Sequence, residues 1–146
     1  MSTCETGKTI DGWSSEFKRE AEMLTNSPLY AGFAVDDIAK AKEFYGGKLG
    51  VRVVEIDAGL LSLQASNGYA VLIYVKDKHE PAAHTILNFP VDDIEAAVDE
   101  LRGAGVEFEQ YEDGPLATDE KGIATPGPKQ AWFKDPAGNI LSVIEG

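Results

Sequence analysis

Cysteine, secretory features and long apolar runs are all scarce in this sequence. The single cysteine, Cys4, has no second thiol to pair with, which excludes an intramolecular disulfide and a cysteine-based metal cluster and favours a reducing compartment. No apolar run approaches the ~18 residues of a membrane span, and residues 1–7 lack the basic and apolar regions of a secretory signal. We therefore expect a cytoplasmic protein that does not contact a membrane.

Basic residues are also few. Lysine and arginine number 13 against 25 aspartates and glutamates, which gives a net charge of −12 at pH 7. Such a charge repels the phosphates of nucleic acids and favours neutral or cationic partners. We therefore expect no nucleic-acid binding. The length of 146 residues suits a single domain.

What the sequence does contain is an internal repeat. Val35-Asp36-Asp37-Ile38 recurs 56 residues later as Val91-Asp92-Asp93-Ile94, and both copies continue as an amphipathic helix. Each copy ends in a hairpin signal, Asn67-Gly68 in the first and residues 135–139 in the second. The repeat indicates one module that has been duplicated.

The apolar periodicity predicts the order βαβββ in each copy, and hence an α+β fold. The aspartate pairs precede the helices and can cap them. Residues 76–83 form a polar linker, and residues 112–129, rich in Gly and Pro, form a loop that we interpret as a flap over a pocket. The first copy has strands at 29–35, 51–58, 60–64 and 69–75 and a helix at 38–46; the second has strands at 85–91, 106–111, 130–134 and 140–144 and a helix at 94–104.

Residues 1–28 form an extension that precedes the repeat. Apolar residues three or four apart predict an amphipathic helix over residues 9–25, which either packs on the domain or docks on a second subunit. Residues 29–146 then make one domain, with modules at about 29–76 and 84–146.

Paired modules of this kind resemble the vicinal oxygen chelate superfamily, which includes glyoxalase I, extradiol dioxygenases, fosfomycin resistance proteins and bleomycin resistance proteins. The resemblance covers about residues 29–146 and implies that each module curls its sheet into half of an open cup, with the ligand or reaction inside. It is carried by the two repeated tetrapeptides, by Phe44-Tyr45, Leu49-Gly50 and Gly105-Val106, and by Phe133-Lys134-Asp135-Pro136-Ala137-Gly138-Asn139-Ile140.

Catalytic members of the superfamily hold a divalent metal with His, Glu or Gln side chains from the first and last strands of each module. The resemblance places these positions at Tyr30 and Ile86 on the first strands and at Leu72 and Ser142 on the last strands. None carries such a side chain, and these residue types are poor ligands or none at all. We therefore expect no cofactor, with a divalent metal only if the register of the ligands differs.

Other ligand-type residues have simpler explanations. His84 lies at the mouth of a predicted strand, where a solvated or capping histidine is the expectation. His79 and Glu80 lie in the polar linker and are expected to be exposed. Glu145 lies on the face of its strand opposite to Ser142, so we expect a solvated carboxylate.

Alternation along the strands predicts which side chains line the cup. The side chains expected to face the helices are Phe33 and Val35 in the first copy and Thr85, Leu87, Phe89 and Val91 in the second. Their neighbours along each strand therefore lie on the other face. The predicted lining combines aromatic and apolar walls with neutral hydrogen-bonding groups, as in small-molecule sites, although the same residues could be ordinary core. It consists of Tyr30, Gly32, Ser62, Leu72, Tyr74, Ile86, Asn88, Trp132 and Ser142.

Three functions fit these observations. The first is a metal-free protein that binds a small molecule, in particular a cationic and partly aromatic one, as bleomycin resistance proteins of the superfamily do. The second is a glyoxalase-like lyase, an isomerase or a dioxygenase with an atypical metal site that uses His84 or the 112–129 loop. The third is an assembly or regulatory module. The resemblance also implies a homodimer, because related proteins pair modules across a two-fold axis.

Overall fold

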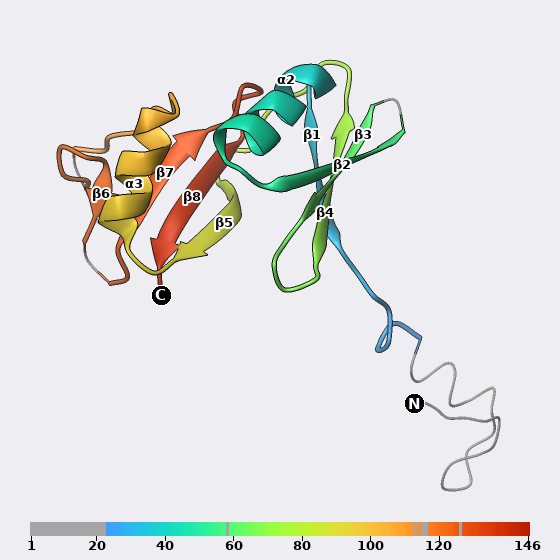
Figure 1. Ribbon diagram of the computed structural model, residues 1–146, viewed down its shortest axis with the longest axis horizontal. Helices are drawn as coiled ribbons and strands as arrows, with labels where there is room; N and C mark the ends of the chain where they lie inside the picture. The colour runs from blue at the N-terminus through green and yellow to red at the C-terminus, as the bar shows by residue number, and fades with distance from the viewer. Residues whose placement is uncertain (1–22, 58, 113, 115–116, 126) are drawn as a thin grey trace, which may run out of the picture.

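Two four-stranded mixed sheets form the protein, each accompanied by helical structure (Figure 1). The computed structural model describes residues 23–57, 59–112, 114, 117–125 and 127–146, so the helix predicted over residues 9–25 lies almost wholly outside the described residues. The first sheet has the order β1-β4-β3-β2, with β1 parallel to β4. Its elements are β1 (Ala31–Val35), α2 (Ile38–Lys42), η1 (Glu43–Lys48, a π-helical segment), β2 (Arg52–Asp57), β3 (Leu60–Gln64) and β4 (Ala70–Val75).

The second sheet repeats this arrangement. Its order is β5-β8-β7-β6, with β5 parallel to β8. This confirms the α+β fold of two βαβββ modules. The elements are β5 (Thr85–Val91), α3 (Ile94–Gly103), β6 (Ile123–Ala124), β7 (Gln130–Lys134) and β8 (Ile140–Glu145).

The strand registers confirm the internal repeat residue by residue. Val35 pairs with Val75 in the first sheet, and Val91 pairs with Glu145 in the second. In each module, the backbone N–H that follows the last strand donates to the carbonyl of this first-strand residue. The N–H of Lys76 donates to the Val35 carbonyl at 3.0 Å, and that of Gly146 donates to the Val91 carbonyl at 3.3 Å. The first strands are thus offset by 56 residues and the last strands by 70, as the sequence predicts.

The aspartate pairs cap the helices, as predicted. Asp37 accepts a hydrogen bond from the backbone N–H of Lys40, and Asp93 accepts one from that of Ala96. Glu145, expected to be solvated, is half-buried, and its Oε2 accepts the N–H of Ile94 at 3.1 Å. The end of β8 therefore satisfies a second unpaired donor at the start of α3.

A single apolar core runs through both modules. The helix-side residues of the two sheets belong to it, among them Val35, Ile73, Phe133 and Leu141. The ring of Phe44 in η1 lies 6.3 Å from that of Phe133 in β7, so the first module packs directly on the second.

Two buried hydrogen bonds also join the modules. The hydroxyl of Tyr45 donates to Asp135 Oδ2 at 2.7 Å, and the side-chain amide of Asn139 donates to the carbonyl of Ala34 at 2.9 Å. Both Asp135 and Asn139 belong to the closing turn between β7 and β8. The closing turn therefore connects the two modules, in addition to joining β7 to β8.

The strand predicted over residues 106–111 is wrong. Val106 and Phe108 are buried in alternation as in a strand, but this segment forms only an isolated bridge, Phe108 with Phe133. The edge of the second sheet is instead the two-residue strand β6, which lies inside the predicted 112–129 loop and pairs with β7. The loop therefore contributes to the sheet, and a flap function stays a prediction.

Within the described part of the chain, no helix is both long and apolar enough to cross a bilayer.

Candidate ligand-binding face

A row of polar side chains crosses the second sheet on the face away from the core. Trp132 pairs with Ser142, and Ser142 pairs with Asn88, so three of the predicted lining residues lie side by side. The hydroxyl of Ser142 donates to Asn88 Oδ1 at 2.5 Å. The side-chain amide of Gln130 donates to Ser142 Oγ at 3.0 Å and to Asn88 Oδ1 at 3.4 Å. These contacts form a connected polar cluster of Asn88, Gln130 and Ser142.

Trp132 forms a wall of this face and is not an open stacking surface. Its side chain is only 5% exposed, and its indole N–H donates to Thr85 Oγ1 at 3.1 Å. The ring of Tyr111 packs against it edge-on, with the centroids 5.7 Å apart. Burial raises the pKa of the Tyr111 hydroxyl, and the charge of Glu109 adds to that rise, so Tyr111 stays neutral near pH 7.

The first sheet carries the equivalent row, in which Ser62 is the one polar side chain. Leu72 pairs with Gly32 on one side and with Ser62 on the other, and Val54 follows Ser62. A side chain at position 32 would meet the Leu72 carbonyl at 3.3 Å, so this position has little room for any residue larger than glycine.

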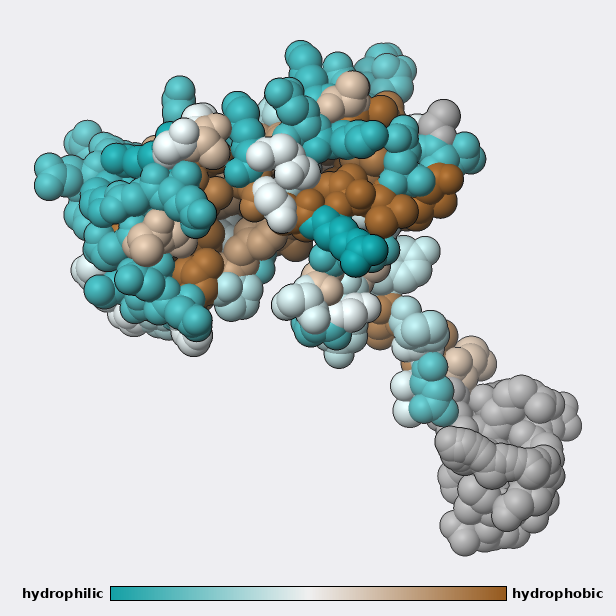
Figure 2. All heavy atoms as spheres, in the orientation of Figure 1, coloured by the Kyte–Doolittle hydropathy of each residue, from teal (hydrophilic) through white to brown (hydrophobic). Residues whose placement is uncertain are grey.

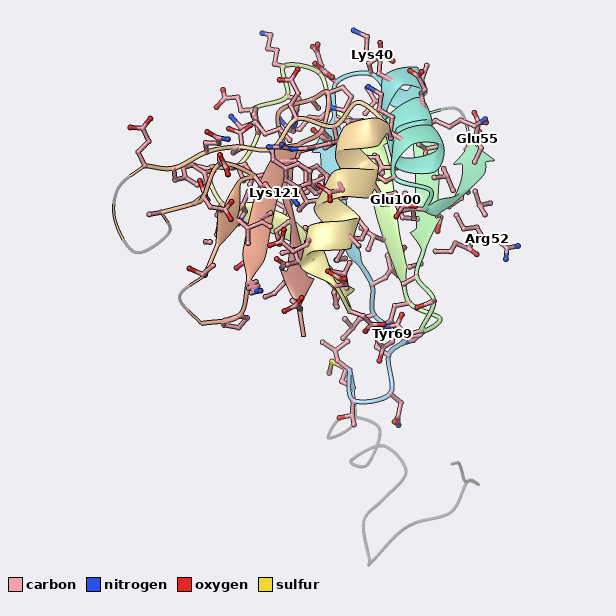
Figure 3. The ribbon with its side chains drawn as sticks, turned by 60° about the vertical axis from the view of Figure 1, so that its left-hand side comes forward. Lys40, Arg52, Glu55, Tyr69, Glu100 and Lys121 are labelled. Carbon is pink, nitrogen blue, oxygen red and sulfur yellow. The ribbon has the colours of Figure 1, made fainter. Side chains whose placement is uncertain are left out.

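Exposed apolar side chains surround this row. Tyr74, in the next row, is 40% exposed, Val54 is 37% exposed and Ile56 is 57% exposed. Figure 2 shows apolar side chains gathered over β2 and β3. Figure 3 shows Arg52 and Glu55 of β2 projecting outward at the edge of the molecule.

Two of the predicted lining residues lie elsewhere. Tyr30 precedes β1 and is 63% exposed. Ile86 occupies an irregularity in the pairing of β5 with β8, where Thr85 pairs with Ile140 and Leu87 with Leu141. Ile86 packs against the core and borders a cavity between the modules. The prediction that Thr85 faces the helix is wrong, because this irregularity turns its hydroxyl toward Trp132.

Sequence reasoning missed Gln130, Thr85 and Tyr111 on this face. Gln130 lies two residues before Trp132 on β7, so strand alternation alone could have placed it there. No local sequence signal marks the irregularity that turns Thr85. Tyr111 was assigned to the strand that does not form.

The residues at the superfamily's metal positions do not fit a divalent metal. Leu72 and Ile86 offer no donor atom, Tyr30 lies outside the strand, and the Ser142 hydroxyl is bonded within the polar cluster. His84 is exposed and directly precedes β5. Across the described residues, no three His, Cys, Asp or Glu side chains come together in a group able to hold a metal ion.

Comparison with known proteins agrees with this architecture. The family model of the Glyoxalase/Bleomycin resistance protein/Dioxygenase superfamily matches residues 28–143. Among proteins with curated descriptions, no sequence matches the chain.

Solved structures share the fold. A glyoxalase family protein from Bacillus anthracis is 20% identical with a TM-score of 0.61, over 81% of this chain and 94% of that chain. The fosfomycin resistance protein FosX from Mesorhizobium loti is 14% identical with a TM-score of 0.58, over 81% and 90%. The antibiotic-binding protein TnmS3 from Streptomyces is 25% identical with a TM-score of 0.55, over 80% and 94%. With a family match over most of its length and the two βαβββ modules in place, the chain belongs to the glyoxalase/bleomycin resistance protein/dioxygenase superfamily.

Proposed function

We propose that the protein binds a small organic molecule on the cup faces of its sheets, through hydrogen bonds and apolar contacts, with no part for a metal. The polar cluster of Asn88, Gln130 and Ser142 is the observation that carries this proposal. The Asn88 side chain is exposed, and among the described residues its amide N–H groups have no partner, so they can donate to a ligand. A few neutral polar groups beside aromatic walls suit a small-molecule site.

The charge of the protein supports a cationic ligand. A net charge of −12 raises the local concentration of cations around the molecule. Tyr74 offers an accessible ring on the first sheet, and a cation over a tyrosine face is stabilised by roughly 0.5–2 kcal/mol. The antibiotic-binding function stated for TnmS3, which shares this fold, also favours a binding protein.

We further propose that a second copy of the chain closes the cup. The cup faces of both sheets lie opposite the shared core, and the first sheet leaves Val54, Ile56 and Tyr74 accessible to water. A two-fold axis would place one copy's first sheet over the other copy's second sheet. We expect sedimentation equilibrium to give a dimer that Val54→Asp dissociates. Glu55→Gln, a change on the helix side of the same strand, should leave the dimer intact, and a wild-type monomer would contradict this closure.

Phenyltrimethylammonium is a suitable probe for the cup, with benzyl alcohol as the uncharged comparison. A ligand whose free concentration is a hundred times its Kd stabilises the folded state by about 2.7 kcal/mol, and thermal unfolding detects such a change readily. We expect Asn88→Ala and Tyr74→Ala to reduce this stabilisation. Tyr69→Ala is the matched control, because Tyr69 is an exposed tyrosine in the turn between β3 and β4 (Figure 3).

The results separate the parts of the proposal. Equal stabilisation of wild type, Asn88→Ala and Tyr74→Ala would refute binding on the cup faces. Equal stabilisation by benzyl alcohol would refute the preference for a cation. One bound divalent metal per chain in protein purified without chelator would refute the metal-free assignment.

A further inference from the structure

A cavity lies at the seam between the two modules. Its volume is about 460 Å³, larger than the cavities of about 250 and 290 Å³ that lie elsewhere along the helices and strands. Phe33 and Ala34 of β1 and Ile86 of β5 supply an apolar wall. The linker that joins the modules supplies the polar wall. The size suits a small organic molecule.

The linker is held against the second module, so the cavity exists before any ligand binds. Pro81 packs on the closing turn so closely that a side chain at Gly138 would come within 3.0 Å of its ring. Asn139, which borders the cavity, is fixed by hydrogen bonds of 2.9 Å to the Ala34 carbonyl and to Asp135.

The polar wall is cationic, although the protein as a whole is strongly acidic. Lys76, Lys78 and His79 line the cavity, and Glu80 is the one carboxylate among the lining residues. Neither lysine forms an ion pair with any described residue, whereas Lys42 and Lys121 each lie within 3.0 Å of a carboxylate oxygen. Two lysines without partners give the cavity a local positive charge, which favours an anion.

The imidazole of His79 adds an unsatisfied polar atom. The linker histidine was expected to be exposed, but its Nε2 is buried and has no hydrogen-bond partner. Leaving a buried polar atom unpaired destabilises the folded state. Because His79 lines the cavity, a turn of its ring would bring Nε2 to a ligand oxygen as the missing partner.

We propose that the seam cavity binds a small anion, a carboxylate or phosphate group on an apolar body. Lys76 and Lys78 neutralise the anionic group, the Nε2–H of His79 donates to one of its oxygens, and the apolar body lies against Phe33 and Ile86. This site does not include the polar cluster on the second sheet, although Tyr74 of the proposed cup also borders it, and the ligand class has the opposite charge. Its test does not depend on the proposed cup ligand.

Nuclear magnetic resonance can test this site with benzoate and phenyl phosphate as probes, and with benzamide as the uncharged analogue of benzoate. The sequence holds two histidines, so each imidazole can be followed individually. We expect both anions to shift the His79 ring resonances in a saturable way, while those of the exposed His84 stay in place. We expect benzamide to shift neither.

Variants with equal changes of charge test the lysines. We expect Lys76→Gln combined with Lys78→Gln to weaken benzoate binding by about tenfold or more. Lys40→Gln combined with Lys129→Gln removes the same charge at exposed positions outside the cavity, and should change the Kd by less than about twofold. Lys40 lies on α2 (Figure 3).

Three outcomes would overturn the proposal. They are equal binding of benzamide and benzoate, an equal loss of binding in the two double variants, and anion-induced shifts at His84 without any at His79. Asn88→Ala should leave benzoate binding unchanged, so failure at this site and failure at the cup are distinguishable.

Discussion

Replacing Tyr45 by phenylalanine should weaken the connection between the two modules. The hydroxyl of Tyr45 is buried and donates to Asp135 Oδ2 at 2.7 Å. A phenylalanine ring can keep the contacts with Phe33 and Phe44, whose ring centroids lie 5.8 and 5.2 Å from that of Tyr45. The change therefore removes one hydrogen bond with little effect on packing.

The expected loss of stability follows from the acceptor. A hydrogen bond to a charged group contributes roughly 1.5–3 kcal/mol, and Asp135 keeps three other donors, from Ala137 N, Asn139 N and Asn139 Nδ2. For a chain of this size, that corresponds to a fall in Tm of roughly 3–12 °C. Urea unfolding followed by tryptophan fluorescence measures the difference, with Tyr69→Phe as an exposed control that should change stability by less than about 0.5 kcal/mol.

The same variant has a specific dependence on pH. Burial, and next the charge and hydrogen bond of Asp135, raise the pKa of Tyr45 far above its ordinary value of 10.0. The folded protein therefore keeps this proton at a pH where the unfolded chain loses it. The contribution is complete below pH 10 and falls by about 1.4 kcal/mol per pH unit above it.

Wild type and Tyr45→Phe should therefore converge at alkaline pH. An advantage of about 2 kcal/mol at pH 7 should vanish roughly 1.5 pH units above pH 10. Two stability curves that stay parallel between pH 9 and 11.5, or a difference below about 0.5 kcal/mol at pH 7, would refute the reasoning.

Two further changes test local features of the fold. Asp93→Ala removes the side-chain cap of α3 and should cost about 0.5–2 kcal/mol in urea unfolding, whereas Asp92→Ala should cost much less, and equal losses would contradict the capping role. Gly138→Ala combines a positive φ of 90° with a 3.0 Å approach to Pro81, whereas Gly59→Ala has a similar φ of 85° and open space. Calorimetry should give a Tm for Gly138→Ala clearly below that of Gly59→Ala. Equal Tm values would show that Pro81 of the linker does not pack closely against the closing turn.

The sequence predicts the fold well where the signals are local. The hairpin turns and the aspartate caps follow from neighbouring residues. The Asn67-Gly68 turn sets the register of Leu72, and the turn at residues 135–139 sets that of Ser142. The strand over residues 106–111 fails for a non-local reason. Its alternating apolar residues are buried as a strand's would be, but β6 occupies the edge of β7 that it would need.

The candidate sites are harder to predict than the fold. A single irregularity in β5 moves Ile86 from the cup face to the seam between the modules and turns Thr85 toward Trp132. The reason is that a shift of one residue along a strand moves every side chain to the opposite face. The buried Nε2 of His79 depends on how the linker packs across the modules, which no pattern within residues 76–83 reveals. Both outcomes are set by tertiary contacts.

The closing turn of the second module has a consequence for how the protein unfolds. The described strands of the two modules make no ladder with each other, yet Asp135 and Asn139 bond directly to residues of the first module. Loss of either sheet would leave these buried polar groups unpaired in the other. The two halves should consequently open together in native-state hydrogen exchange, with the slowest amides of β4 and β8 sharing one opening free energy. A duplicated chain would then behave as one cooperative unit, with the turn of one copy coupling the stability of both.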